Sequence, residues 1–219
     1  MSEEKDQYHD ERSAIRDYGV ELIERGLTEG TGGNLSIRLD DEHIAISPSG
    51  VPYGDIDVWD VPVVDFDGNV LAGDREPSTE LPMHLSVYEE RDDVGGVVHT
   101  HSPYATAFAA LGEPIPASHY LVAFAGTEVP VAEYRTHATP ELGAAATEAL
   151  GDEFKATLLK NHGVLTASDS LASAFDVAQM VEYCARIHHL ASTVGTPDIL
   201  PDEEIRRIQG KLESYGTSE

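Results

Sequence analysis

The features that most restrict how this chain can fold are two short apolar runs, VGGVVHTH at residues 94–101 and ATLLKNHGVLT at residues 156–166. Short apolar runs bounded by turn residues are typical of buried strands. The second run is interrupted by Asn161-His162-Gly163, which predicts a tight turn between two strand pieces. The chain therefore needs a sheet that other elements cover.

The rest of the chain alternates between strand patterns and helix patterns. The runs LSIRL and HIAISPSG predict a hairpin through Asp40-Asp41, and VPVVDFDGNVL predicts another through Asp67-Gly68-Asn69. Strands in hairpins mixed with helices indicate an α+β or mixed α/β fold in which helices cover a sheet. The helical spacing of apolar residues predicts helices at 11–26, 81–91, 102–112, 170–192 and 201–216.

We expect residues 1–219 to form one domain, because 41% of the residues are hydrophobic and no linker or internal repeat divides the chain. The first residues, MSEEKDQYHDER, are too charged for a secretion signal. No apolar run approaches the roughly 20 residues that span a bilayer. These features predict a cytoplasmic protein, and the single cysteine, Cys184, lies in a predicted helix where we expect no catalytic role.

The formal charge of -26 argues against two classes of partner. The acidic residues are spread along the chain, and such a surface repels nucleic-acid phosphates and anionic lipids, so we expect neither nucleic acid nor membrane as a partner. Lysine is also scarce, which suggests a halophilic source with a cytosol rich in screening salt. An anionic substrate would need a local pocket of hydrogen-bond donors to overcome the negative charge of the protein.

The two histidines in VVHTHSP indicate a metal site. Side chains two residues apart point to the same face of a strand, so His99 and His101 would aim their rings at a common point. The alternative is a pair of hydrogen-bonded histidines at a strand end. His162 favours metal, because it lies in a turn after another buried strand and could supply a third imidazole. Three such ligands leave the open position of a catalytic zinc site, and iron, manganese or cobalt would suit the same ligands.

The remaining histidines carry weaker signals. We expect His84, one helical turn after Glu80, to lie in the core or behind the same cavity. Five more are expected in solvent or on the long predicted helix: His9, His43, His137, His188 and His189.

Three segments could bind an anion through neutral donors. GTGGN at 30–34 resembles a dinucleotide fingerprint but follows a helix and opens a strand, the reverse of that motif. Its backbone amides could still form an anion nest. Ser47-Pro48-Ser49-Gly50 combines hydroxyl groups with a flexible backbone, and Ser78-Thr79 opens a predicted helix whose dipole favours an anion. Together they make a phosphorylated small molecule plausible, with Glu80 as a general base.

At this point the sequence resembles the class II aldolase and adducin family. The resemblance covers nearly the whole chain and runs through GTGGNLSIR, SPSGVPY, PSTE, VVHTHSPYATAFA, IPASHYLVAFAG, KNHGVL and ESYG. It implies an α/β fold, a three-layer α/β/α sandwich around a central, largely antiparallel sheet. It also implies a homotetramer with fourfold symmetry and sites at the subunit interfaces.

The resemblance assigns roles to individual residues. Glu80 matches the catalytic acid/base, and Tyr120 matches a tyrosine that protonates the aldehyde oxygen from a neighbouring subunit. Tyr215 matches a tail tyrosine that closes the site. His99, His101 and His162 match the ligands of one zinc ion per subunit. The phosphate-binding positions match Asn34, Ser49, Gly50, Ser78 and Thr79.

The implied reaction is the zinc-dependent, reversible aldol cleavage of a ketose 1-phosphate such as L-fuculose 1-phosphate. Its products would be dihydroxyacetone phosphate and a short aldehyde such as L-lactaldehyde. A sugar-phosphate 4-epimerase of the L-ribulose-5-phosphate type is the nearest alternative, but those relatives have an aspartate at the position of Glu80. A thio-sugar phosphate dehydratase is more distant. A non-catalytic, adducin-like module is disfavoured because the metal ligands are present.

Overall fold

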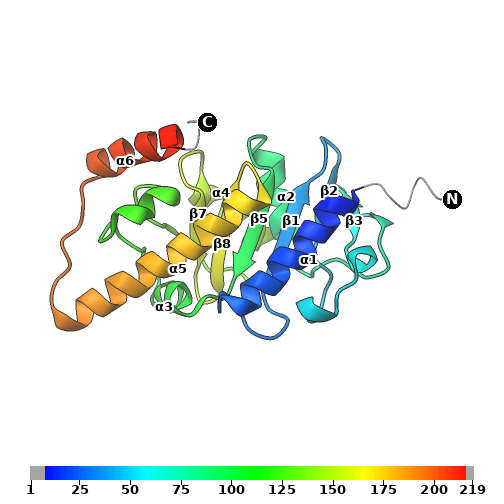
Figure 1. The fold of residues 1–219 in the computed structure, drawn as a ribbon, viewed down its shortest axis with the longest axis horizontal. Coiled ribbons are helices and arrows are strands. Elements are labelled where there is room, and N and C mark those ends of the chain that lie inside the picture. Colours follow the sequence, from blue (N-terminus) through cyan, green and yellow to red (C-terminus); the bar gives the residue numbers. More distant parts are fainter. Residues whose placement is uncertain (1–7, 216–219) are drawn as a thin grey trace.

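The computed structural model describes the backbone of residues 8–215 and the side chains as far as residue 212 (Figure 1). Its α-helices are α1 (His9–Glu24), α2 (Leu81–Glu90), α3 (Pro103–Leu111), α4 (Pro140–Leu150), α5 (Leu171–Val194) and α6 (Asp202–Tyr215). Its strands are β1 (Asn34–Arg38), β2 (His43–Ile46), β3 (Val63–Asp65), β4 (Val70–Ala72), β5 (Gly96–Thr100), β6 (Val131–Ala132), β7 (Ala156–Leu159) and β8 (Gly163–Ser168). Short 3-10 helices are η1 (Tyr53–Asp55), η2 (Val58–Asp60) and η3 (Tyr120–Phe124).

Most of these elements follow the sequence patterns. The five predicted helices and both predicted hairpins are present, with ends shifted by a few residues. Helix α4 was not predicted, although Pro140 at its first turn and Gly151 after its last residue are the usual signals of a helix start and end.

The strands form one sheet in the order β4-β3-β2-β1-β5-β8-β7-β6. Neighbouring strands are antiparallel except β6 and β7, which run parallel. The sheet is therefore mixed, and this corrects the largely antiparallel sheet that the resemblance implied. The physical reason is that α4 connects β6 to β7, and a helical crossover returns the chain to the end from which a parallel strand starts.

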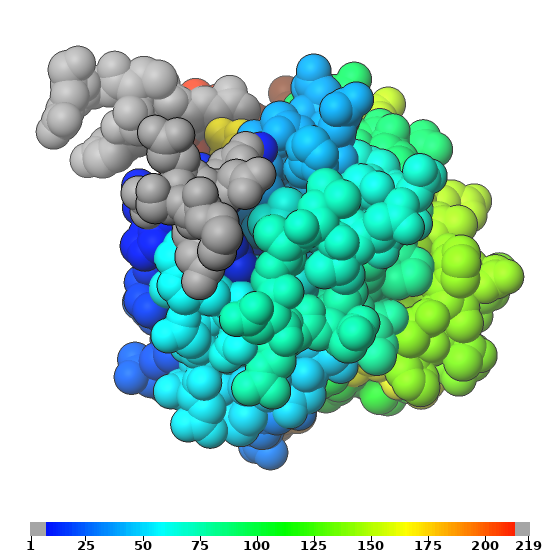
Figure 2. All heavy atoms as spheres, turned by 90° about the vertical axis from the view of Figure 1, so that its right-hand side faces the viewer, coloured from blue at the N-terminus to red at the C-terminus, as the bar shows by residue number. Residues whose placement is uncertain are grey.

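Apolar side chains cover both faces of the sheet. Successive residues of β5 point to opposite faces: Val97 packs with residues of α2 and α4, whereas Val98 packs with residues of α1 and α5. Figure 1 shows α1 and α5 crossing the sheet on one side. In Figure 2, the cyan and turquoise residues between β2 and α2 form much of the face turned to the viewer.

The order of the strands places several loops at one end of β5. Because β5 is antiparallel to both neighbours, its end lies beside the start of β1 and the start of β8. Asn34 is paired with His99, and Thr100 is paired with Val164. The GTGGN loop and the turn at His162 therefore meet the histidines that end β5.

No helix in the described part of the chain combines the length and the apolar character that crossing a membrane requires.

The close packing of β5 on α5 predicts that a methyl group added at Gly96 destabilises the fold. A Cβ at Gly96 would overlap the backbone of Leu171 at the start of α5. We expect Gly96→Ala to lower the free energy of unfolding in urea by about 1–3 kcal/mol, the usual cost of overpacking. The control is Gly210→Ala, in the exposed interior of α6 with open space around it, which should raise stability by up to about 1 kcal/mol. Equal stability of the two variants at one protein concentration would refute this account.

Candidate active site

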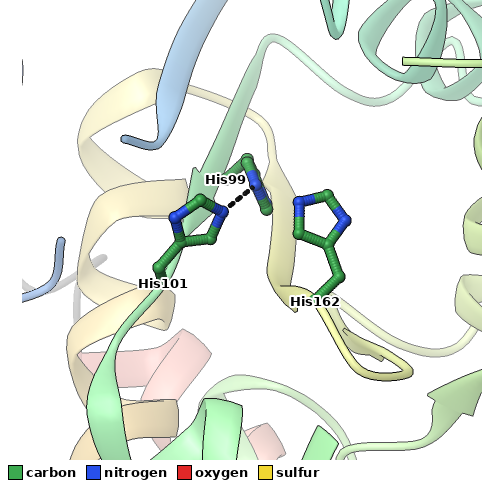
Figure 3. A group of neighbouring side chains, drawn as sticks. All are labelled: His99, His101 and His162. Carbon is green, nitrogen blue, oxygen red and sulfur yellow. Dashed lines mark hydrogen bonds between the residues drawn. The ribbon is translucent and has the colours of Figure 1, made fainter. Parts of the chain in front are cut away.

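Three imidazoles converge at the end of β5 (Figure 3). The Nε2 atoms of His99 and His101 are 3.0 Å apart, and the ring centroid of His162 lies 4.8 Å from that of His99 and 5.3 Å from that of His101. One ring nitrogen from each residue lies within 4.8 Å of the others. The strand pair and the turn therefore bring together the three histidines that the sequence singled out.

The ring of His99 is held in one tautomer. Its Nδ1 donates to the carbonyl oxygen of Val164 at 2.8 Å, so the lone pair is on Nε2, which faces the other two rings. Burial lowers the pKa of His99 to about 3, and burial also lowers the pKa values of His101 and His162. The three rings are therefore neutral at pH 7, the state in which imidazole binds a metal.

Two residues of the His162 turn allow the rings to approach one another. Gly163 has no Cβ, and a Cβ there would overlap the carbonyl oxygen of Thr100 and lie 2.9 Å from His101 Cδ2. Asn161 has φ 57°, a left-handed conformation that asparagine tolerates better than most residues. Its backbone N–H donates to Ala109 at 3.0 Å, which fixes the turn against α3.

The carboxylate of Glu80 lies against the three rings. Its Oε2 is 3.2 Å from His99 Nε2 and accepts a hydrogen bond from Asn34 Nδ2 at 2.8 Å. Its Oε1 is 3.3 Å from His162 Nε2, is buried, and accepts no hydrogen bond from any residue that the structure describes. Burial acts to raise the pKa of Glu80, whereas a protonated His99 and the hydrogen bond from Asn34 act to lower it, and the pKa lies below its usual value.

This donor set fits a divalent cation. Each of the three neutral imidazoles brings a ring nitrogen within 4.8 Å of the others, and the Oε1 of Glu80, which accepts no hydrogen bond from the described residues, lies 3.3 Å from the Nε2 of His162. Imidazole ligands suit zinc and several other divalent transition metals.

The segments predicted to bind an anion lie next to one another. The backbone N–H of Ser78 donates to the carbonyl of Ser47 at 3.0 Å, which joins SPSG to the PST segment. The Tyr53 hydroxyl donates to the carbonyl of Gly33 at 3.1 Å, which joins the GTGGN loop to the same region. Of the four predicted phosphate residues outside the GTGGN loop, Ser78 and Thr79 directly precede Glu80, while Ser49, next to Gly50, donates its backbone N–H to the carbonyl of Glu76 at 3.0 Å.

Other predicted residues have different surroundings. The side chain of Asn34 is buried and bonded to Glu80, and one of the two N–H groups of its amide remains available. Tyr120 opens η3 with 48% of its surface exposed, and among described residues it forms no hydrogen bond or ring contact with the three histidines or Glu80. Tyr215 ends α6, but its side chain lies outside the described residues. His84 is fully buried behind Asn34, as expected for the core or the back of the cavity.

One residue near the site has no signal in the sequence. Both carboxylate oxygens of Glu182, on α5, accept backbone N–H groups at the start of α3: Tyr104 at 3.0 Å and Ala105 at 2.9 Å. These bonds fix the segment that follows His101. The partners are 77 and 78 residues apart, so no local pattern could predict them.

The chain is similar to known aldolases over nearly its whole length. Residues 13–189 match the model of the class II aldolase and adducin N-terminal domain. A 5-deoxy-D-ribulose 1-phosphate aldolase of Bacillus thuringiensis is 44% identical over 94% of this chain and 97% of its own length. An L-fuculose phosphate aldolase of Escherichia coli K12 is 36% identical over 92% of this chain and 94% of its own. A solved structure of an L-fuculose 1-phosphate aldolase has a TM-score of 0.90 and 45% identity, covering 93% of this chain and 96% of its own.

The histidine cluster predicts that a divalent ion binds and stabilises the fold. We expect the purified protein to bind about one zinc ion per chain, and His162→Ala to lose it, because two imidazoles hold zinc far more weakly than three. Removing the ion with a chelator should lower the melting temperature, since the metal binds the folded site preferentially. Elemental analysis and thermal unfolding measure both effects. His43→Ala, which changes a histidine on β2 outside the cluster, should keep the ion, and an equal zinc content in His162→Ala would contradict the assignment.

The burial of His84 predicts acid sensitivity of the metal-free protein. Burial lowers the pKa of His84 to about 4, while an unfolded histidine titrates near about 6.5. As the pH falls through this window the unfolded state takes up the proton first, so stability should decline by up to about 1.4 kcal/mol per pH unit from this residue. Urea unfolding between pH 7 and pH 4 measures the slope.

The fall of the unfolding free energy with decreasing pH should be shallower in His84→Gln, because glutamine cannot take up a proton when the chain unfolds. It should stay as steep in His43→Gln or become steeper, because the hydrogen bond with Asp40 raises the pKa of His43 and so contributes stability that is present at low pH. A His84→Gln slope equal to that of the unmodified protein would show that His84 does not cause the acid sensitivity.

Proposed function

The chain belongs to the class II aldolase and adducin family, and we propose that it cleaves a ketose 1-phosphate reversibly into dihydroxyacetone phosphate and a short aldehyde. Its family and its named aldolase relatives make it a class II aldolase, an enzyme. The observation that carries the proposed reaction is the buried carboxylate of Glu80, which lies between three neutral imidazoles and the segments expected to bind phosphate.

The reaction breaks the bond between C3 and C4 of the substrate. The electrons of that bond remain on C3 and are delocalised onto the oxygen at C2, where negative charge develops. We propose zinc as the ion held by His99, His101 and His162, and when bound it would polarise substrate oxygens as a Lewis acid. The neutral rings leave the whole positive charge of the ion available for this purpose.

Glu80 would handle the proton on carbon. In the condensation direction its carboxylate removes a proton from C3 of dihydroxyacetone phosphate, and in cleavage it returns one. The lowered pKa keeps Glu80 ionised at pH 7, as a base must be. Its Oε1 accepts no hydrogen bond from the described residues, so that oxygen is available to accept the proton.

The phosphate would be bound by neutral donors close to Glu80. Ser49, Gly50 and Thr79 are exposed beside the buried Ser78, and the second N–H of Asn34 could add a donor. These residues lie near the N-terminus of α2, where the helix dipole favours an anion. Such local donors could bind an anion even on a chain of net charge -26.

We propose that the complete site needs more than one chain. Tyr120 is half-exposed and, among the described residues, forms no hydrogen bond or ring contact with the histidine cluster, which supports a role in a neighbouring subunit. A homotetramer would supply its hydroxyl as the proton donor to the aldehyde oxygen, and Tyr215 would close the site from the tail. This assembly and both roles rest on the family resemblance.

The length of the aldehyde depends on the substrate. Cleavage of a 5-deoxypentulose 1-phosphate leaves C4 and C5 as acetaldehyde, whereas L-fuculose 1-phosphate leaves three carbons as L-lactaldehyde. The relative named for 5-deoxy-D-ribulose 1-phosphate is 44% identical and the relative from E. coli K12 named for L-fuculose phosphate is 36% identical. We therefore propose a deoxy-sugar 1-phosphate as the substrate class, with acetaldehyde and L-lactaldehyde as the first aldehydes to test.

The proposed setting is the cytosol of a halophilic organism. The support is the even spread of 40 acidic residues against 14 basic ones, a balance that screening by salt would tolerate. Retention of activity in molar potassium chloride tests this setting, and inactivation by that salt would refute it.

The zinc-loaded protein should convert dihydroxyacetone phosphate and an aldehyde into a ketose 1-phosphate. Acetaldehyde, L-lactaldehyde and glycolaldehyde are incubated separately, and the products are identified by NMR and mass spectrometry. Failure to consume dihydroxyacetone phosphate with any aldehyde would refute the aldolase proposal. Interconversion of L-ribulose 5-phosphate and its 4-epimer, without aldol products, would support the epimerase instead.

The matched variant in this assay is Glu80→Gln. It keeps the size of the side chain and the three imidazoles, so zinc should still bind, but it has no base. We expect aldol turnover to fall by about a hundredfold to ten-thousandfold, the range typical of a lost acid/base catalyst. Full turnover with normal zinc content would remove Glu80 from the proposed mechanism.

A further inference from the structure

A chain of buried hydrogen bonds runs from Glu80 into the core between β1 and α2. Asn34 Nδ2 donates to Glu80 Oε2 at 2.8 Å, and Asn34 Oδ1 lies 2.5 Å from His84 Nε2. On the other side of the ring, His84 Nδ1 lies 2.6 Å from Ser36 Oγ, which lies 2.9 Å from the Tyr88 hydroxyl. All five side chains are buried, so water does not compete for these bonds.

The chemistry of each group fixes the direction of every bond. An ionised Glu80 can only accept, so the amide of Asn34 presents its NH2 group to the carboxylate and its oxygen to His84. That oxygen can only accept, so the proton of His84 is on Nε2. Nδ1 then accepts from the Ser36 hydroxyl, and Ser36 accepts from Tyr88.

His84 can donate one of these hydrogen bonds and accept the other because its ring stays neutral. Burial lowers its pKa to about 4, so at pH 7 it carries one ring proton and one lone pair. The ring can therefore donate to Asn34 and accept from Ser36 at the same time. A doubly protonated ring could not accept from Ser36, and an apolar side chain could do neither.

We propose that His84 is a positioning residue that holds the Asn34 amide with its NH2 group toward Glu80, so that Oε2 is anchored and Oε1 is left to exchange the proton. Without His84, the amide could turn and present its oxygen to the carboxylate, which would repel it. The carboxylate would then lose the bond that separates the roles of its two oxygens. This inference rests on the proposed function, because it assigns the proton transfer to Glu80.

The first experiment measures the ring tautomer and does not depend on catalysis. The zinc-loaded protein is labelled with ¹⁵N-histidine, and long-range ¹H–¹⁵N correlations are recorded at pH 7. We expect one histidine with the proton on Nε2 whose signals disappear in His84→Gln. A proton on Nδ1 of His84, or a doubly protonated ring, would overturn the proposed hydrogen-bond directions.

The second experiment isolates the proton transfer. The zinc-loaded protein is incubated with saturating dihydroxyacetone phosphate in D2O without aldehyde, and exchange of the C3 proton is followed by ¹H NMR. His84→Leu should slow exchange by roughly 10- to 100-fold, the usual effect of losing a residue that orients a group of a metal site. His84→Gln should recover most of the rate, because its amide can place an N–H donor near the position of Nε2.

Controls separate positioning from a loss of folding or metal. Zinc content and the unfolding curve are measured for each variant, and the rate is compared only at temperatures where the variant is folded. His43→Leu replaces a histidine on β2 that is bonded to Asp40, outside the buried chain, and should exchange at the unmodified rate. In an Asn34→Ala background, His84→Leu should slow exchange by less than about twofold, because the residue through which it acts is gone.

The outcomes distinguish a failure of the proposed function from a failure of the positioning role of His84. If the unmodified protein exchanges no C3 proton, the proposed function fails. If the unmodified protein exchanges the proton and folded, zinc-loaded His84→Leu does so equally fast, only the positioning role of His84 fails. Equal slowing by His84→Leu with and without Asn34 would also refute it, because His84 would then act by another route.

Discussion

The antiparallel pairing of β5 with both β1 and β8 is the constraint on which the site depends. It places the end of one strand beside the starts of two others, so that His99, the turn at His162 and the GTGGN loop meet within one small region. A shift of the register by one residue would turn His99 toward the opposite face of the sheet. The apolar residues Val97 and Val98, which pack into different clusters on the two faces, oppose such a shift, so the core also fixes the position of the histidines.

The same packing sets the electrostatics of the site. The GTGGN loop and Gly163 allow backbone to lie against the imidazoles, which removes water and keeps the rings neutral. Glu80 is buried in the same region, but its pKa lies below its usual value and Asn34 donates a hydrogen bond to its carboxylate. One small volume therefore holds three neutral imidazoles beside a charged carboxylate. On a surface of strongly negative charge, this arrangement gives a cation a site whose ligands need not first lose protons.

Local patterns in the sequence predicted much of this arrangement. The period of two in VVHTH places His99 and His101 on one side, and the glycine after His162 indicates the turn that carries the third ring. The helices followed from their apolar spacing, except α4, whose alanine-rich sequence gives a weaker contrast between its faces. Patterns of this kind do not specify which strands become neighbours, so the parallel pairing of β6 with β7 and the Glu182 bonds to α3 could not be predicted. Asn34 is an instructive case, because its motif suggested an anion site, whereas its buried side chain also orients Glu80.

The position of the described residues also explains why the sequence points to a reaction more readily than to a substrate. The imidazoles, Glu80 and the neutral donors beside α2 would all act on the dihydroxyacetone phosphate half, which every candidate ketose 1-phosphate shares. The candidates differ only beyond C4, in the half that leaves as aldehyde. Tyr120, the residue that the family resemblance assigns to that half, is exposed and forms no hydrogen bond or ring contact with the three histidines among the described residues. In the proposed homotetramer, selection among aldehydes would fall to the surface of the neighbouring subunit, where side chains can change without disturbing β5, its partners or the three histidines.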